Sequence, residues 1–506
     1  MPMCPVLLRY LVLAVFLSPR VDIALADDPK ARVQHTSPTV TLPSPTTADD
    51  SLREMTVRPG FTVELVAAEP LTMDPVSFAW GPDGKLWVVE MADYPSGMDG
   101  DGEFGGRVRY LEDSDDDGRY DRSTVFLDGL GFPSGVMPWR DGVLVSCAPD
   151  IFYAEDSDGD GRSDIRHVLF SGFEEGNQQH RMNGFTWGLD NWVHGANGDS
   201  GGVIRSHPRE AMVSIAGRDF RVDPDSGRVE PQTGPSQFGR QRDDWGNWFG
   251  THNSNPLFHF VLQDHYLRRN PHVATPNPQV NVSVIPGASP VYPTSRTTER
   301  FNEPDRANRF TSACGATIYR DELFGPQFTG NSFVCEPVHN LVHREVIRAT
   351  GVTFTSQRAD DEQRSEFLSS RDSWFRSTMC RTGPDGALWV ADMYRHVIEH
   401  PEWIPTDWQD QLDVRAGDDR GRIYRVFPSH ERPRRIRRLD QLGTRELVAA
   451  LSSPNGWERD MAHQMLLWQD DDSALEPLRQ LALRAERPLA RLHALCVIRR
   501  IARFDR

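Results

Sequence analysis

The sequence predicts an all-β, six-bladed β-propeller followed by a short α-helical, HEAT-like tail. A Gly/Asp turn followed by a short apolar or aromatic strand recurs six times along the chain. The composition of 40 Gly, 37 Pro and 13 Trp is typical of a body of strands and turns. The final part of the chain instead has helical periodicity.

The recurring element defines the blades. It is written most clearly as GPDGKLWV from Gly81 and GPDGALWV from Gly383. The six turns are marked by Asp83, Asp141, Asp190, Asp244, Gly330 and Asp385. They recur roughly every 50 to 60 residues, with one longer interval that holds a Pro- and Asn-rich insertion at 268–308. One unit cannot bury its own faces, so the six are expected to close into a ring.

The N-terminus has the pattern of a secretory signal. Arg9 gives a positive region, Leu11 to Leu17 a short apolar run, and Ala24-Leu25-Ala26 a small-x-small cleavage site. The alternative is an N-terminal anchor helix, but the apolar run is too short to span a bilayer. The sequence therefore predicts a signal peptide over residues 1–26 and an exported protein, periplasmic or extracellular.

The rest of the chain divides by composition. Residues 27–54 are rich in Pro, Thr, Ser and Asp and are predicted to be a disordered leader. The propeller is expected over 55–428 and a basic linker over 429–443, where few contacts should cross. Helical segments over 444–506 predict the HEAT-like repeats, expected to be dispensable for the propeller.

Net charge excludes one class of protein, and the length of the apolar runs excludes another. The 506 residues hold 56 Lys and Arg against 73 Asp and Glu, a formal net charge of −17. A nucleic-acid binder driven by a basic surface is excluded, because phosphate contacts need positive patches. A polytopic membrane protein is excluded as well, because no apolar run reaches the length of a transmembrane span.

Two acidic loops share the pattern DxDxDGxxD. Carboxylates at positions 1, 3 and 5 wrap a hard cation, and the glycine at position 6 makes the sharp turn. The twelfth position of an EF-hand, a glutamate, is missing, and the alternative is an acidic solvated turn. The sequence predicts two structural Ca²⁺ loops, with the ligand residues Asp113, Asp115, Asp117, Asp121, Asp156, Asp158, Asp160 and Asp164.

Polar residues also gather beside the predicted blade strands. His180 precedes one strand and could act as a general base at the propeller mouth, although a strand-capping histidine is the plainer interpretation. Arg240, Gln241 and Asn253 bracket another strand, and Arg376 precedes the last. Converging arginines suit a polycarboxylate ligand, whereas ordinary pairing between blades is the alternative.

Cysteine usage gives weaker information. Five cysteines follow the predicted cleavage site, so at least one is unpaired within a monomer. Cys314 and Cys335 flank one hairpin-like stretch and are the best guess for a disulfide. No CxxCH motif occurs, so covalent c-type haem is not expected in this chain.

At these residues the chain resembles the soluble quinoprotein glucose/sorbosone dehydrogenase-like propellers. More closely, it resembles the bacterial putative membrane-bound dehydrogenases, also called PVC-type haem-binding CxxCH proteins, here without the haem domain. The text that carries the resemblance includes GFTVELVAAEP, DSDGDGRSD, NGFTWGLDNW and GPDGALWVADMYRHVIEHPEWIP.

The resemblance implies a chemistry. His180, which stands before Gly188 as the family's histidine stands before its turn, would be the catalytic base. Arg240, Gln241, Asn253 and Arg376 would hold pyrroloquinoline quinone (PQQ), a tricarboxylate cofactor. The lysine expected to face the quinone has no clear counterpart. A sugar or polyol would be the substrate, and an external acceptor such as a cytochrome would take the electrons.

Two alternatives stay open beside this PQQ-type dehydrogenase. The propeller mouth could be a non-catalytic binding module for glycans or a protein partner. A calcium-centred hydrolase is the third option, since propellers host unrelated chemistries. The dehydrogenase requires His180, Arg240 and Arg376 to face one cavity.

Overall fold

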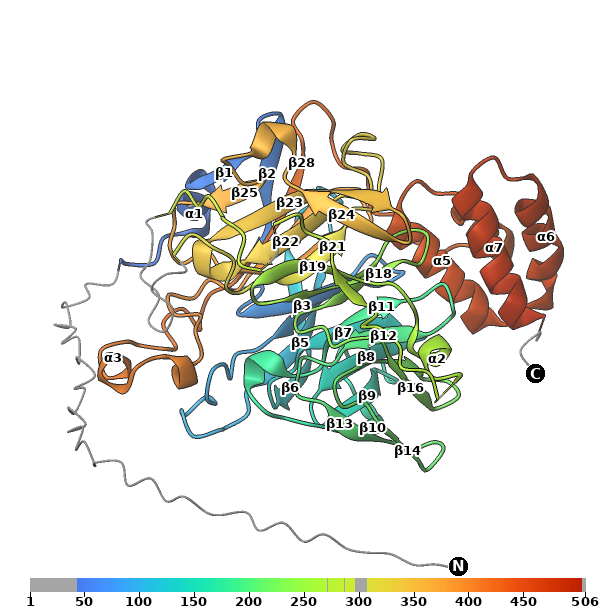
Figure 1. The fold of residues 1–506 in the computed structure, drawn as a ribbon, viewed down its shortest axis with the longest axis horizontal. Coiled ribbons are helices and arrows are strands. Elements are labelled where there is room, and N and C mark those ends of the chain that lie inside the picture. Colours follow the sequence, from blue (N-terminus) through green and yellow to red (C-terminus); the bar gives the residue numbers. More distant parts are fainter. Residues whose placement is uncertain (1–42, 271, 286, 296–306, 503–506) are drawn as a thin grey trace, which may run out of the picture. The chain divides into compact units, whose positions relative to one another are not determined.

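Six antiparallel sheets form the body of the protein (Figure 1). The computed structural model describes residues 43–270, 272–285, 287–295 and 307–502. The innermost strands contact one another in sequence order, and the sixth contacts the first, which closes the ring. The predicted six-bladed β-propeller is confirmed. The predicted signal peptide lies outside the described residues, as does most of the leader.

The inner strands of the first three blades follow one another along the chain, but a hairpin of two strands between the second and third strands of blade three extends blade two. Blade one contains β3 (Pro75–Trp80), β4 (Leu86–Glu90), β5 (Gly106–Glu112) and β6 (Arg122–Leu130). Blade two contains β7 (Gly135–Trp139), β8 (Gly142–Cys147), β9 (Asp150–Glu155), β10 (Ile165–Phe173), β13 (Gly202–Ser206) and β14 (Ala211–Ser214). Blade three contains β11 (Asn183–Trp187), β12 (Val193–Ala196), β15 (Asp219–Asp223) and β16 (Arg228–Gln232).

The last three blades complete the ring. Blade four contains β17 (Arg240–Arg242), β18 (Trp248–His252), β19 (Asn255–Phe260) and β20 (Gln279–Asn281). Blade five contains β21 (Cys314–Ile318), β22 (Ser332–Glu336), β23 (Leu341–Thr350), β24 (Thr353–Gln357), β25 (Leu368–Ser370) and β1 (Met55–Val57). Blade six contains β26 (Ser377–Thr382), β27 (Leu388–Asp392), β28 (Arg422–Pro428) and β2 (Phe61–Ala68).

The two ends of the propeller sequence meet in blade six. The N-terminal strand β2 pairs antiparallel with β28, from Phe61 opposite Pro428 to Ala68 opposite Arg422. The second strand of the propeller is therefore the outer strand of the last blade, whereas the first strand, β1, pairs with β25 in blade five. This pairing joins the ends of the ring and leaves no gap between first and last blades.

The recurring turn joins the first and second strands of each blade. In blade six, the Trp389 indole Nε1 donates to the turn residue Asp385 over 2.8 Å. In blade three, His194 takes the place of the tryptophan, and its Nε2 lies 3.0 Å from Asp190. An aspartate that accepts from a ring N–H four residues later fixes the turn against the strand that follows. This contact explains why a ring nitrogen follows the turn aspartate in both blades.

The end of the predicted leader is ordered, which corrects the expectation of disorder up to residue 54. Helix α1 spans Ala48–Arg53, and the Thr47 side chain caps its N-terminus by accepting from the Asp50 N–H. The Thr46 N–H donates to the Tyr394 hydroxyl over 2.9 Å. The polar composition that predicted disorder instead supplies hydrogen bonds to the propeller.

Four helices form the tail, coloured red in Figure 1: α4 (Thr444–Ala450), α5 (Gly456–Gln469), α6 (Leu475–Arg484) and α7 (Pro488–Ile501). A single helical turn at Asp472–Ala474 precedes α6 within the tail. Short helices elsewhere are α2 (Asp264–Leu267), α3 (Thr406–Gln409) and single turns at Gln178–His180, Pro337–His339, Asp360–Glu362 and Pro401–Trp403. None of the described helices has the length and apolarity of a membrane span. Tail and propeller belong to one compact unit, Leu42–Arg506.

The tail contacts the recurring turns, contrary to the expectation that few contacts cross the linker. The Asn455 side chain donates to the Gly383 carbonyl over 2.8 Å. His463 lies 2.8 Å from the Asn191 side-chain oxygen. Both contacts are made to turn residues of blades six and three. The turns that define the repeat therefore also form the docking surface for the helices.

Buried ion pairs connect the tail to the propeller. Asp460 on α5 accepts from Arg242 at 2.5 Å and from Arg320 at 2.6 Å. Arg459, the residue before it, pairs with Asp244 in the turn of blade four. The Arg242 side chain has no exposed surface, and that of Asp460 is 13% exposed. Removing the tail would leave Arg242 without a carboxylate and would reduce the rest of this network to the Arg320–Asp244 pair.

Candidate functional site

A cavity of about 420 Å³ opens at the mouth of the ring, where the inner strands begin. Its polar wall includes Gln179, His180, Gln241, His252, Asn253 and Glu399. Its apolar wall includes Val76, Met91, Phe238, Met393, Ile398 and Trp403. The volume falls in the range of pockets that enclose a small organic ligand.

His180 faces this cavity, as the sequence predicts. It ends the single helical turn Gln178–His180, just before β11. The Gln237 side-chain amide lies 3.1 Å from His180 Nε2. An amide N–H can only donate, so the imidazole nitrogen that it meets accepts and is unprotonated. Burial lowers the pKa of His180, which keeps the ring neutral at pH 7.

Two predicted amides are free to bind a ligand. Gln241 on β17 and Asn253 after β18 both line the cavity and are partly exposed. Neither side-chain amide has a hydrogen-bond partner among the described residues, whereas the neighbouring Asn183 amide bonds to Arg181 and Gln237 carbonyls. Each free amide offers two donors and an acceptor to a bound molecule.

The two predicted arginines do not face the cavity. Arg240 is 1% exposed, and its Nη1 lies 2.7 Å from Asp219. Its guanidinium lies between the rings of Trp248 and Phe260, 5.0 and 4.5 Å from their centroids. The guanidinium is thus held between blade three, which supplies Asp219, and blade four, which supplies the two rings.

Arg376 is also buried, and it binds backbone rather than a carboxylate. Its Nε donates to the Arg395 carbonyl over 2.8 Å, and its Nη1 to the Pro337 carbonyl over 2.9 Å. The side chain ties the loops after β22 and β27 to the start of β26. The expectation that His180, Arg240 and Arg376 converge on one cavity is therefore met only by His180.

The described residues do not fit a bound tricarboxylate. Arg181 is the only arginine or lysine among the described residues that line the cavity. Its Nε donates to the Glu175 carbonyl over 2.6 Å, and its guanidinium lies over the Phe132 ring. PQQ bound here would have carboxylates facing amides and apolar side chains, without a free cation to pair with them.

The sequence missed several residues that complete the site. Gln237 positions His180, and Trp403 and Phe238 form apolar surface across the cavity. Gln237 stands just before the FGRQRDDWG segment, so its closeness to a predicted blade strand was the one available signal. Trp403 comes from the long connection after β27, and no local pattern assigns it to the cavity.

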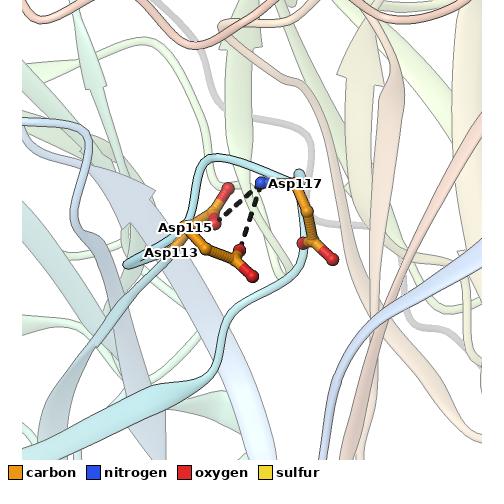
Figure 2. Close-up of side chains that lie close together, drawn as sticks. All are labelled: Asp113, Asp115 and Asp117. Atoms are coloured by element: carbon orange, nitrogen blue, oxygen red, sulfur yellow. Dashed lines mark hydrogen bonds between the residues drawn. The ribbon is translucent and has the colours of Figure 1, made fainter.

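The first acidic loop has the geometry of a cation loop (Figure 2). Carboxylate oxygens of Asp113, Asp115 and Asp117 lie within 4.8 Å of one another. The Asp117 N–H donates to Asp113 and Asp115, which curls the loop around the three carboxylates. Burial and the neighbouring aspartates raise the pKa of Asp113. Oxygen ligands at these positions fit Ca²⁺.

The second loop repeats the first. Asp156, Asp158 and Asp160 form the same group. The ninth residue of each loop stands apart from that group, which corrects the predicted ligand set. Asp121 accepts from the Ser114 hydroxyl over 2.6 Å, and Asp164 accepts from the Ser157 hydroxyl over 2.6 Å. These two aspartates fold the loop onto itself.

The guessed disulfide is not formed. Cys314 and Cys335 are opposite each other on β21 and β22, but both are free thiols. A register irregularity follows Cys314, whose thiol lies 3.8 Å from the Ser377 carbonyl. The Cys335 thiol instead contacts Cys380, and burial raises its pKa.

A family model matches residues 47–430, and its description reads "Domain of unknown function (DUF7133)". The chain belongs to this family. The matched segment contains the whole propeller and ends before the helical tail. No curated protein matches the sequence.

Several solved structures are similar in fold at low identity. A luciferin-regenerating enzyme is 11% identical, with a TM-score of 0.43 over 75% of this chain and 99% of its own. The apo soluble aldose sugar dehydrogenase of Escherichia coli is 13% identical, with a TM-score of 0.41 over 73% and 99%. The holo PQQ domain of pyranose dehydrogenase from Coprinopsis cinerea is 13% identical, with a TM-score of 0.40 over 76% and 98%. Identities and TM-scores this low indicate a similar fold and say nothing about the activity of this chain.

Proposed function

We propose that the mouth cavity binds a small neutral sugar or polyol. The observation that carries the proposal is the pair of unpartnered amides, Gln241 and Asn253, facing a cavity with one apolar wall. A pyranose has apolar ring faces and a rim of hydroxyls, so one molecule can contact both kinds of wall. Trp403 and Phe238 offer aromatic surface to the apolar face, and the amides offer hydrogen bonds to the hydroxyls.

His180 supports a hydroxylated ligand. Its neutral ring holds one nitrogen lone pair, and Gln237 fixes the orientation of the ring. A ligand hydroxyl that displaced the Gln237 amide would donate to this nitrogen. The two calcium loops lie in turns between third and fourth strands, away from the amides, so Ca²⁺ would stabilise blades rather than contact the ligand.

Isothermal titration of the full chain against a panel of monosaccharides and polyols tests this proposal. Gln241→Leu and Trp403→Ala should each weaken binding by about 5- to 30-fold, since each removes a contact worth roughly 1–2 kcal/mol. Trp245→Ala is the matched control, because Trp245 is 59% exposed and lies outside the cavity lining. A panel without any binder, or equal losses in all three variants, contradicts the proposal.

A dehydrogenase is the second candidate, favoured by the neutral His180 facing the cavity. The imidazole would take the proton of a substrate hydroxyl, the hydride on the same carbon would require an added two-electron acceptor such as a quinone, and an acceptor external to the chain, such as a cytochrome, would finally receive the electrons. Export to the periplasm or the extracellular space would place the site where such acceptors and sugars meet.

Reconstitution with PQQ, Ca²⁺ and a dye acceptor separates the two candidates. Sugar binding without dye reduction is the expected result, because the described residues that line the cavity offer no free cation to the cofactor carboxylates. Sugar-dependent dye reduction that falls by 10²–10⁴-fold in His180→Gln would instead establish the dehydrogenase with His180 as its base.

A further inference from the structure

Arg381 makes a hydrogen bond that crosses the centre of the ring. It lies on β26, the inner strand of blade six, and its Nη2 donates to the Phe185 carbonyl over 3.0 Å. Phe185 lies on β11, the inner strand of blade three. In a ring of six consecutive blades the third and sixth are opposite each other. The Arg381 side chain therefore lies across the central channel.

The same strand connects Arg381 to the mouth cavity. Thr378, Met379 and Cys380 line the cavity, and Arg381 is the next residue toward the turn. Arg381 keeps some accessible surface although it is enclosed by the ring. Partial accessibility inside an enclosure is expected of a side chain in a narrow channel that admits water or an ion.

Arg381 lacks a counterion among the described residues. No described carboxylate pairs with it, and its Nε is buried without a hydrogen-bond partner. Burial lowers its pKa to about 10, and the only titratable neighbour that acts against this shift is the Cys380 thiol. The guanidinium is thus still protonated at pH 7, and its positive charge is uncompensated in a poorly solvated place.

Other buried arginines of the propeller are compensated. Arg240 pairs with Asp219 and Arg395 with Asp74. Arg376 has no such pair but donates to several backbone carbonyls. Arg381 has one carbonyl partner and leaves Nε unbonded. A charge left in this condition requires a compensating group that none of the described residues supplies.

We propose that the central channel holds a small monovalent anion against Arg381. The ligand class is a halide or a carboxylate, because both can accept from a guanidinium N–H on the accessible side of Arg381 and neutralise its charge. The anion could be free in solution, or it could be the carboxylate of a molecule that reaches down from the cavity. This site is separate from the amides of the proposed sugar site and does not depend on that function.

Thermal unfolding in different sodium salts tests the anion site. The full chain is melted in chloride, formate or gluconate and compared with a bulky sulfonate buffer of equal ionic strength. Chloride and formate should each raise Tm by about 2–4 °C in a saturable way, since an anion that binds only the folded chain stabilises it. Arg381→Met should lose the response, whereas Arg348→Met, at an exposed arginine of β23, should keep it.

Comparing the different salts distinguishes a free anion from the carboxylate of a larger ligand. A response to chloride and formate supports a free ion, and a response to gluconate alone supports the carboxylate of a larger ligand. Equal responses in Arg381→Met and wild type, or none in wild type, overturn the proposal. If Arg381→Met does not fold, ³⁵Cl line broadening on the wild-type chain decides, with saturable broadening displaced by formate expected and linear, undisplaced broadening contradicting the site.

Discussion

The two faces of the propeller treat their polar groups differently. At the mouth, the Gln241 and Asn253 amides face an open cavity without partners among the described residues. At the opposite face, where the recurring turns lie, Asp244 accepts from Arg320 and Arg459, and Asp460 is held by two arginines. Amides that are open to a cavity without partners indicate a place for a ligand, whereas a buried network of paired charges indicates a structural contact.

This difference explains why the prediction that arginines beside the blade strands bind a carboxylate ligand was wrong. Arginines attract attention as carboxylate binders, but buried arginines here mostly hold blades and helices together. Arg240 of blade four is paired with Asp219 of blade three, and Arg242 is paired with the tail. The less conspicuous residue between them, Gln241, is the one that faces the cavity.

Removing the helical tail should have the largest effect. A chain that ends at Ser429 would expose the docking surface and leave Arg242, Asp244 and Arg320 without their tail partners. Breaking one buried pair costs about 3–5 kcal/mol, so losing several is expected to unfold or aggregate the propeller. Solubility and far-ultraviolet circular dichroism measure this, with removal of residues 503–506 alone as the control. A soluble, β-rich propeller with an unchanged Tm would show that the tail is dispensable after all.

Asp460→Ala should have the next largest effect. It leaves the unexposed Arg242 without a carboxylate and is expected to cost about 3–5 kcal/mol of unfolding free energy in urea titrations. Glu322→Ala is the matched control, because the Glu322–Arg487 pair also joins propeller to tail but its side chains are 57% and 46% exposed. That exposed pair should contribute about 0–1 kcal/mol. Similar losses in both variants would mean that burial does not set the strength of these contacts.

Much of the fold could be predicted from local sequence. The recurring turn and the strand after it are local features, so they revealed the six blades before any contact was known. The docking of the tail depends on contacts such as Asp460 with Arg242 between distant segments. A composition-based boundary at the basic linker cannot detect them.

The candidate site was only partly predictable, and one error was avoidable. Successive residues of a strand point to opposite faces. Arg240 and Gln241 are neighbours on β17, so both could not face the same cavity. Their burial alternates as expected, with Arg240 and Arg242 buried and Gln241 partly exposed. Trp403 could not have been found, because its place depends on the path of a long loop.

The two acidic loops allow a comparison between carboxylates that lie near arginines and carboxylates that do not. Ca²⁺ at 100-fold above Kd should raise the unfolding free energy by about 3 kcal/mol, and chelation should lower Tm. Asp158→Ala should remove more of this response than Asp115→Ala. The first loop lies beside Arg425, whose guanidinium approaches Gly118, and Arg435 lies 4.0 Å from Asp116. Those cations oppose Ca²⁺, whereas none of the described salt bridges involves an aspartate of the second loop. A melting curve unaffected by chelator would contradict both calcium loops.

Acid should weaken the tail-side face gradually, through His463. Burial lowers the pKa of His463 to about 3, against an unfolded value of about 6.5. Between these values the unfolded chain binds the extra proton and the folded chain does not. Stability from this residue is therefore complete above pH 6.5 and is lost as pH falls toward 3, by about 1.4 kcal/mol per pH unit.

His463→Gln should remove one such contribution from the slope of unfolding free energy between pH 6 and 4, measured by urea titration at several pH values. Gln keeps a donor for Asn191 and cannot titrate. His180→Gln is the informative comparison, because His180 lies at the mouth, is only half-buried and meets the solvent-filled cavity. It should change the slope less than His463→Gln does. Equal changes in the two variants would mean that burial lowers the histidine pKa equally at the two faces.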